Sequence, residues 1–192
     1  MSNEGNMPKQ DANIDSGKRS LAGKYLTFRL SAEEYGLEIL KVREIIGLMD
    51  ITNVPRTPEY IRGVINLRGK VIPVLDLKTK FNMGNTEETD ETCIVVVEVS
   101  GKDNTSTQMG ALVDAVSEVL DIQDNQIEDA PAFGTGVDTR FILGMGKVNN
   151  EVKILLDIDE VLTTTDLSLL ENIGSQGSSV KSEEREAEPV LS

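Results

Sequence analysis

The sequence contains no histidine, no tryptophan and a single cysteine among its 192 residues. Without histidine, the chain lacks the commonest general base near neutral pH, the usual activator of a serine or cysteine nucleophile, and imidazole metal ligands. The lone cysteine excludes an intramolecular disulfide, which fits a reducing compartment. Three tyrosines and four phenylalanines suggest no platform for stacking nucleic-acid bases. We therefore predict a binding protein that is not an enzyme and needs no cofactor.

Long apolar runs are also missing. No stretch approaches the ~18 apolar residues of a membrane span, and residues 1–20 hold no apolar core of a secretion signal. We therefore expect a cytoplasmic protein that is neither exported nor inserted into a membrane. The formal net charge of −14 argues against nucleic acid and anionic lipid as partners.

The charge is unevenly distributed along the chain. Residues 41–81 contain eight basic and four acidic side chains, a balance of +4, whereas residues 98–160 contain four basic and thirteen acidic ones, a balance of −9. Such an asymmetry can orient a protein against a complementary partner, although ordinary solvated faces would also produce it.

One segment, Gly144-Met145-Gly146-Lys147, invites comparison with a phosphate-binding loop. That motif requires glycine at position 141 and serine or threonine at position 148, where this chain has Phe141 and Val148. Two glycines beside a strand are more simply explained by a tight turn with positive φ. We expect a turn here and no nucleotide site.

Two carboxylates, Asp157 and Asp159, could share one face, as acids do in metal and glycosidase sites. The equivalent place in the first half of the chain holds Asp76, with no second acid two residues on. An aspartate that follows a strand is explained by helix capping. We expect no metal site, and a C-terminal helix over about residues 160–173 with Asp159 as its cap.

Short β patterns dominate the middle of the chain. Residues 25–30 alternate between apolar and polar side chains, as a half-buried strand does. The run 93–97 is apolar throughout and predicts a buried strand, with Cys93 as a structural thiol. The apolar run 71–75 contains Pro73, which we expect at a sheet edge or a bulge because proline donates no ladder hydrogen bond.

Composition divides the chain into three regions. Residues 1–20 are almost entirely polar and predict a disordered leader. Residues 21–165 predict the folded domain, in two lobes of roughly 21–90 and 91–165. Residues 166–192 predict the end of the helix followed by a flexible acidic tail.

The folded region repeats itself. Residues 36–46 recur 74 residues later as 110–120, and residues 60–63 recur 81 residues later as 141–144. A seven-residue insertion accounts for the change of offset and fits the glycine-rich stretch 134–136. Each half contains about five short strands, which suits a small barrel that removes its own sheet edges. We predict a mainly β protein built from the same five-stranded unit twice.

A hairpin in the first half concentrates features suited to a partner. The pattern of residues 64–77 predicts a strand, an Arg68-Gly69-Lys70 turn in which Gly69 permits the reversal, and a second strand. The planar guanidinium of Arg68 beside an exposed turn could grip a carboxylate of this chain or of a partner. A solvated turn arginine is the alternative explanation.

Residues 35–45 and 57–69, with the second-half segments 112–116 and 155–157, resemble the bacterial chemotaxis coupling protein family CheW. The resemblance covers about residues 21–165, and its most specific part is the Asn66-Leu67-Arg68-Gly69 hairpin. It implies two five-stranded SH3-like barrels around a shared core. It also implies an adaptor between transmembrane chemoreceptors and the histidine kinase CheA, whose regulatory domain has this fold.

The resemblance assigns the receptor and kinase contacts to Val42, Glu44, Gly63, Arg68 and Val119. It further implies that Glu44 and Arg68 pair with each other. For Val42 and Val119, packing in the core remains the alternative, because an apolar residue in a strand is usually buried.

Two other functions stay open from the sequence. The same fold occurs within the kinase and within a coupling protein fused to a receiver domain, although this chain leaves no room for either addition. A small β-barrel enzyme or ligand carrier unrelated to chemotaxis is the second alternative, and the missing histidine argues against it.

Overall fold

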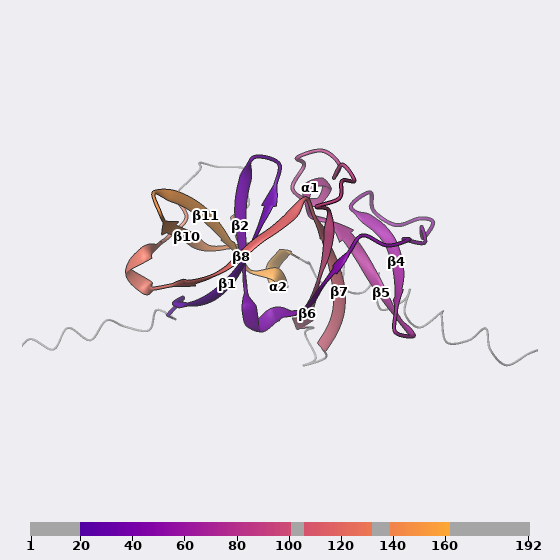
Figure 1. The fold of residues 1–192 in the computed structure, drawn as a ribbon, viewed down its shortest axis with the longest axis horizontal. Coiled ribbons are helices and arrows are strands. Elements are labelled where there is room, and N and C mark those ends of the chain that lie inside the picture. The colour runs from indigo at the N-terminus through magenta and orange to yellow at the C-terminus, as the bar shows by residue number, and fades with distance from the viewer. Residues whose placement is uncertain (1–19, 101–105, 132–138, 162–192) are drawn as a thin grey trace, which may run out of the picture.

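The computed structural model describes residues 20–100, 106–131 and 139–161, and these ranges are mainly β (Figure 1). The strands are β1 (Gly23–Leu30), β2 (Glu33–Glu38), β3 (Val42–Gly47), β4 (Ile61–Leu67), β5 (Lys70–Asp76), β6 (Cys93–Ser100), β7 (Ser106–Val113), β8 (Ala115–Ile122), β9 (Ile127–Glu128), β10 (Ile142–Val148) and β11 (Glu151–Leu156). The helical segments are the 3-10 turns η1 (Ile39–Lys41) and η2 (Asp124–Gln126) and the short helices α1 (Leu77–Lys80) and α2 (Ile158–Val161). None of the helices in these ranges is long and apolar enough to cross a membrane.

The strands form two sheets that lie side by side (Figure 1). One sheet has the order β8-β1-β2-β11-β10-β9 and the other β3-β6-β7-β5-β4. Each sheet closes on itself. The chain that leaves β3 returns to pair with β4 through a bridge between Thr52 and Val64, and the chain that leaves β8 pairs with β10 through β9. The prediction of two barrels is confirmed.

The two barrels are built from equivalent strands. β1 to β5 and α1 in the first repeat correspond to β6, β7, β8, β10, β11 and α2 in the second. The parallel pairs also correspond, because Val74 of β5 lies opposite Gly110 of β7 as Leu155 of β11 lies opposite Gly36 of β2. Gly63 and Gly144 both follow a register shift in their hairpins. The predicted internal repeat is therefore present in the fold.

The two sheets do not coincide with the lobes predicted from the sequence, 21–90 and 91–165. Each sheet combines the first hairpin of one repeat with the last three equivalent strands of the other, and one sheet also holds the short β9. Accordingly, β1 pairs with β8 and β6 pairs with β3. The three residues of η1 carry the chain from one sheet to the other. The two repeats thus exchange their first hairpins. The predicted boundary near residue 90 lies between β5 and β6, which belong to the same barrel.

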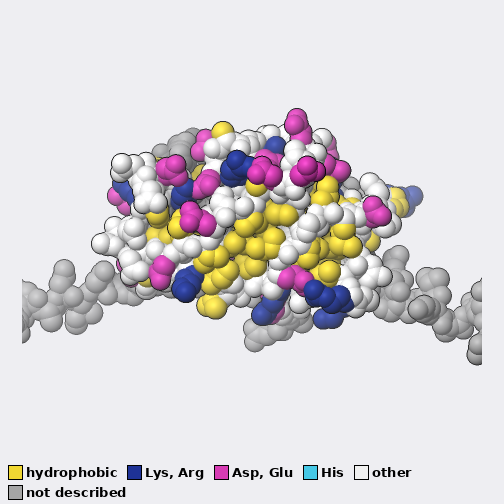
Figure 2. Space-filling model, viewed as in Figure 1, with side chains coloured by type: hydrophobic (Ala, Val, Ile, Leu, Met, Phe, Trp, Pro, Cys, Tyr) yellow, Lys and Arg dark blue, Asp and Glu magenta, His cyan; other side chains and the backbone are white. Residues whose placement is uncertain are grey.

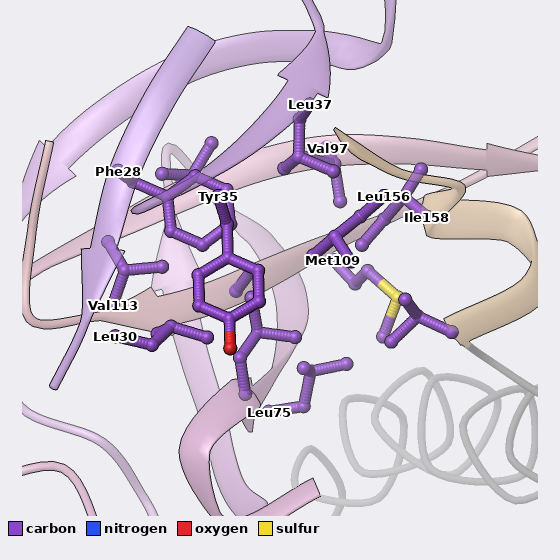
Figure 3. Close-up of a cluster of buried hydrophobic side chains, with 14 of the residues drawn as sticks. Phe28, Leu30, Tyr35, Leu37, Leu75, Val97, Met109, Val113, Leu156 and Ile158 are labelled. Atoms are coloured by element: carbon purple, nitrogen blue, oxygen red, sulfur yellow. The ribbon is translucent and has the colours of Figure 1, made fainter. Parts of the chain in front are cut away.

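The largest core lies between the two sheets (Figure 3). Its buried side chains come from both: Phe28, Leu37 and Leu156 from one sheet, and Val97 and Met109 from the other. Each barrel also has a smaller core of its own, of which one is centred on β4, β5 and β6 and the other on β1 and β11. The first hairpin of each repeat therefore contributes to the core that joins the barrels.

The apolar run 93–97 lies in β6, a central strand between β3 and β7. Its side chains are buried on both faces because one face points into a barrel and the other into the shared core. Cys93 is buried, and its burial raises the pKa of its thiol, which is typical of an unreactive structural cysteine. Pro73 lies in β5, an inner strand. β7 pairs with β5 only from Val74 onward. The amide hydrogen that Pro73 lacks is therefore not needed for the hydrogen bonds between β5 and β7.

Two local predictions were wrong. Gly144 and Gly146 lie inside β10 and not in a turn. A Cβ on Gly144 would come within 3 Å of Ile127 and Glu128 in β9. Asp159 does not cap α2, because the carboxylate of Asp157 accepts hydrogen bonds from the amide groups of residues 159 and 160. The rest of the predicted helix beyond residue 161, the glycine-rich stretch 134–136, residues 1–19 of the predicted leader and the predicted tail lie outside the described residues.

The close pairing of β5, β6 and β7 generates a prediction for Gly110. A Cβ at this residue would lie 2.6 Å from Cγ2 of Ile94 and 3.2 Å from Cγ2 of Val74, and both side chains are fully buried. We expect Gly110→Ala to lower the free energy of unfolding by about 1–3 kcal/mol, because stiff β-branched neighbours cannot move aside. Urea unfolding measures the change.

Gly47→Ala provides the control, since a Cβ there would meet nothing within 4 Å. It should leave the stability unchanged or slightly raised. Equal losses in the two variants would contradict the close-packing argument.

Candidate partner-binding site

The β4–β5 turn holds an arginine in an unfavourable backbone conformation. Arg68 has φ +52° and Gly69 φ +85°, the pattern of a two-residue turn in which asparagine and glycine are preferred. The equivalent turn of the second repeat uses Asn149 and Asn150, both with positive φ. The side-chain oxygen of Asn66 accepts a hydrogen bond from the amide of Gly69 at 2.9 Å. An arginine at the first position is conformationally costly, so its side chain is the feature that distinguishes this turn.

The guanidinium of Arg68 forms a two-pronged contact with Glu44. Nη1 lies 2.8 Å from Oε1 and Nη2 lies 2.7 Å from Oε2. The Arg68 side chain is 75% exposed, whereas that of Glu44 is 28% exposed. The hydrogen bonds from Arg68 hold the pKa of Glu44 below its ordinary value. The pairing that the family resemblance implies is therefore present in the structure.

This contact joins parts of the barrel that share no ladder. Glu44 lies on β3 and Arg68 in the β4–β5 turn, at opposite ends of the strand order. The pair therefore spans the seam at which the barrel closes, and it presents a cation and an anion side by side to solvent. An exposed pair of this kind adds little to stability. It is well suited to exchange hydrogen bonds with a charged partner.

The other predicted contact residues occupy different settings. Val42 is half-buried at the start of β3 and packs against the shared core. Val119 lies on β8 of the other sheet, where 49% of it is exposed. Of the five predicted residues, all of which the structure describes, Glu44 and Arg68 are the pair joined by hydrogen bonds. The predicted set thus comprises one pair, one nearby strand residue and one apolar residue on the second barrel.

Gly63 has an evident structural role. It is buried, with φ +140°, and a Cβ there would lie 2.1 Å from the carbonyl oxygen of Thr52. Thr52 pairs with Val64, the residue after Gly63, in the bridge that closes the barrel. A side chain at position 63 would therefore push the closing segment away. Any effect of Gly63 on partners must pass through the shape of the barrel.

Exposed apolar side chains recur at equivalent positions, and of these only Val119 was among the residues predicted from the sequence. Ile45 on β3 corresponds to Val119 on β8, and Val71 on β5 corresponds to Val152 on β11; each is about half exposed. Val71 opens an apolar run, so its pattern indicated a buried residue. The repeat itself was the available signal, because it places Val71 and Val152 in register. Figure 2 shows hydrophobic side chains gathered in the middle of one face, where the barrels meet.

With this geometry in place, comparison with known proteins identifies the family. Residues 24–166 match the family model described as a CheW-like domain. The chain belongs to the CheW-like family. It is 35% identical over 150 residues to the chemotaxis protein CheW of Klebsiella aerogenes, covering 78% of this chain and 87% of that protein. It is 34% identical over 140 residues to the CheW of Bacillus subtilis, covering 72% and 86%.

A solved structure agrees. The crystal structure of the scaffolding protein TtCheW from Thermoanaerobacter tengcongensis is 38% identical in sequence, with a TM-score of 0.66, over 76% of this chain and 91% of that one. CheW-like proteins of this kind are chemotaxis scaffolds. The function of the chain is accordingly that of a chemotaxis adaptor and not of an enzyme.

Several carboxylates elsewhere on the surface are also held in their ionised form. The ammonium group of Lys153 lowers the pKa of Glu34, and the hydroxyl of Ser20 lowers that of Asp124. The pKa of Glu98 is lowered chiefly by a hydrogen bond from Ser106. Among the described residues, no group of three or more His, Cys, Asp or Glu side chains could hold a metal ion.

These lowered pKa values predict the acid limit of stability. The unfolded carboxylates have pKa values of about 4, and the folded ones lie lower, so their contribution is complete above the unfolded pKa. It is lost as the pH falls through the folded values. We expect the free energy of unfolding to be flat from pH 7 to about pH 5 and to fall below about pH 4, as measured by urea unfolding at each pH.

Glu34→Gln should lower stability at neutral pH and weaken this decline, because Glu34 is paired with the buried Lys153. Glu59→Gln serves as the control, since Glu59 is exposed and has no ion pair among the described residues. A Glu34→Gln curve that runs parallel to the wild-type curve below pH 5 would exclude this carboxylate as a source of the acid sensitivity.

Proposed function

We propose that this chain couples transmembrane chemoreceptors to the histidine kinase CheA, as a cytoplasmic adaptor recruited to receptor arrays. The observation that carries the proposal is the exposed pair of Arg68 and Glu44, set on a costly turn in a chain of the CheW-like family. A turn that served only to connect strands would use the residues of the second repeat, Asn149 and Asn150.

The two barrels provide the separate surfaces that an adaptor needs. One barrel carries the Arg68–Glu44 pair and the exposed Ile45, and the other carries the exposed Val119. We assign receptor or kinase contacts to this set together with Val42 and, through the barrel shape, Gly63. The basic segment 41–81 supplies three strands of one barrel, and most of the acidic segment 98–160 lies in the other, which favours a different electrostatic character for each barrel.

Simultaneous binding is the direct test of this function. A dedicated interface of standard size buries about 800 Å² on each partner, which one barrel can supply while the other stays free. We expect the chain to bind the CheA regulatory domain and a receptor cytoplasmic fragment together, as a ternary complex in size-exclusion chromatography. Strict competition between the two partners would refute the adaptor function.

Arg68→Ala should separate binding from folding. We expect the affinity for the receptor fragment to fall roughly thirtyfold, as for truncation of a well-placed interfacial arginine. The midpoint of thermal unfolding should move by no more than about 3 °C, because the pair is exposed. Arg68→Lys keeps the charge but loses the planar fork, so it should recover only part of the affinity.

Arg29→Ala is the matched control, since Arg29 forms an exposed ion pair with Glu91 away from the β4–β5 turn. It should leave receptor affinity unchanged. A large loss of stability in Arg68→Ala would make Arg68 a structural residue. Unchanged binding and unchanged stability would make it an unimportant surface residue.

A further inference from the structure

Asn66 lies at the foot of the turn that carries Arg68. It is exposed near the end of β4, opposite the exposed Val71 of β5. Its side-chain oxygen accepts the amide hydrogen bond of Gly69, which is the only side-chain hydrogen bond that Asn66 makes within the described residues. Asn66 therefore contacts the backbone of the turn and contributes little to the core.

The second repeat lacks this arrangement. The residue equivalent to Asn66 is Lys147, which pairs with Glu128 at 2.7 Å. The turn there consists of Asn149 and Asn150, which adopt positive φ readily without help. A side-chain hydrogen bond therefore supports the turn that contains the conformationally unfavourable Arg68. In the other turn, which needs no such support, the equivalent residue makes an ion pair instead.

We infer that Asn66 is a positioning residue for Arg68: its hydrogen bond to Gly69 holds the turn so that the guanidinium meets Glu44 before a partner arrives. The inference rests on the proposed function for its meaning in binding. Its structural part concerns the free protein alone and can be tested without a partner.

The geometry fixes Arg68 at both ends. At the backbone end, Asn66 closes the turn through Gly69, and at the guanidinium end, Glu44 holds both terminal nitrogens. A long side chain that is free in solution loses rotamer freedom when a partner immobilises it. Ordering Arg68 in advance removes part of that loss. Removal of Asn66 should therefore leave the fold intact and weaken binding through Arg68.

The test combines side-chain relaxation with a double-mutant cycle. ¹⁵N relaxation of the Arg68 Nε–H group in the free protein should show lower order in Asn66→Ala, with wild-type order in Asn66→Asp, which keeps an acceptor oxygen. In titration with the receptor fragment, Asn66→Ala should weaken binding about tenfold, and Asn66→Asp should stay within about threefold of wild type. In the Arg68→Ala background, Asn66→Ala should change affinity less than twofold.

Lys147→Ala, the same position in the second repeat, is the control and should leave the order of Arg68 unchanged. Unchanged order of Arg68 in Asn66→Ala would overturn the inference, as would an equal loss of affinity with and without Arg68. If the wild-type chain does not bind the receptor fragment, the proposed function fails, and the relaxation measurement alone decides whether Asn66 positions Arg68.

Discussion

The structure depends on burial of the first hairpin of each repeat in a core that belongs to both barrels. Phe28 and Leu37 from one hairpin and Val97 and Met109 from the other are fully buried there. Because each of these hairpins is hydrogen-bonded into the sheet of the opposite repeat, the shared core and the two ladders form together. Neither barrel has a complete set of strands without a contribution from both halves of the chain.

This arrangement provides a firm base for the candidate site. The site spans a seam that no ladder crosses, so its geometry depends on how accurately the barrel closes. The bridge between Thr52 and Val64 joins the two edges of the barrel, and the backbone of Thr52 passes so close to Gly63 that no side chain fits between them. These two contacts fix the closure. On this base, Arg68 and Glu44 can remain exposed and still keep a defined orientation. Surface placement with a defined orientation is what an adaptor requires from its contact residues.

Much of the fold could be predicted from local patterns. Alternation and apolar runs located the strands, and the two offsets of the repeat indicated a unit built twice. The pairing of Arg68 with Glu44 followed from the family resemblance and not from spacing. The proposed contact residues Val42 and Val119 could be named, but their exposure could not, because a valine in a strand has the same local pattern whether it lies inside or outside.

The exchange of hairpins could not be predicted from the repeat. Two equivalent copies of a strand satisfy the same local pattern, so the pattern does not say which copy pairs with β3; in the structure it is β6. The functions of Gly144 and Gly146 were missed for a similar reason. Ile127 and Glu128 approach Gly144, and Ile122 and Leu155 approach Gly146, all from other strands. A glycine does not show in the sequence whether it permits a turn or a close neighbour.

The exchange of hairpins also bears on how such a fold can originate. Apart from the two-residue strand β9, each sheet uses two strands from one repeat and three equivalent strands from the other. Two copies of a single half-length chain therefore have the equivalent strands needed for both sheets. Such a half-chain would form a symmetric, domain-swapped homodimer with the same shared core. Fusion of two genes for that half would then convert a twofold axis between subunits into the pseudo-symmetry of one chain. It would also free the two halves to diverge, so that an arginine could appear in one turn while asparagine remained in the other.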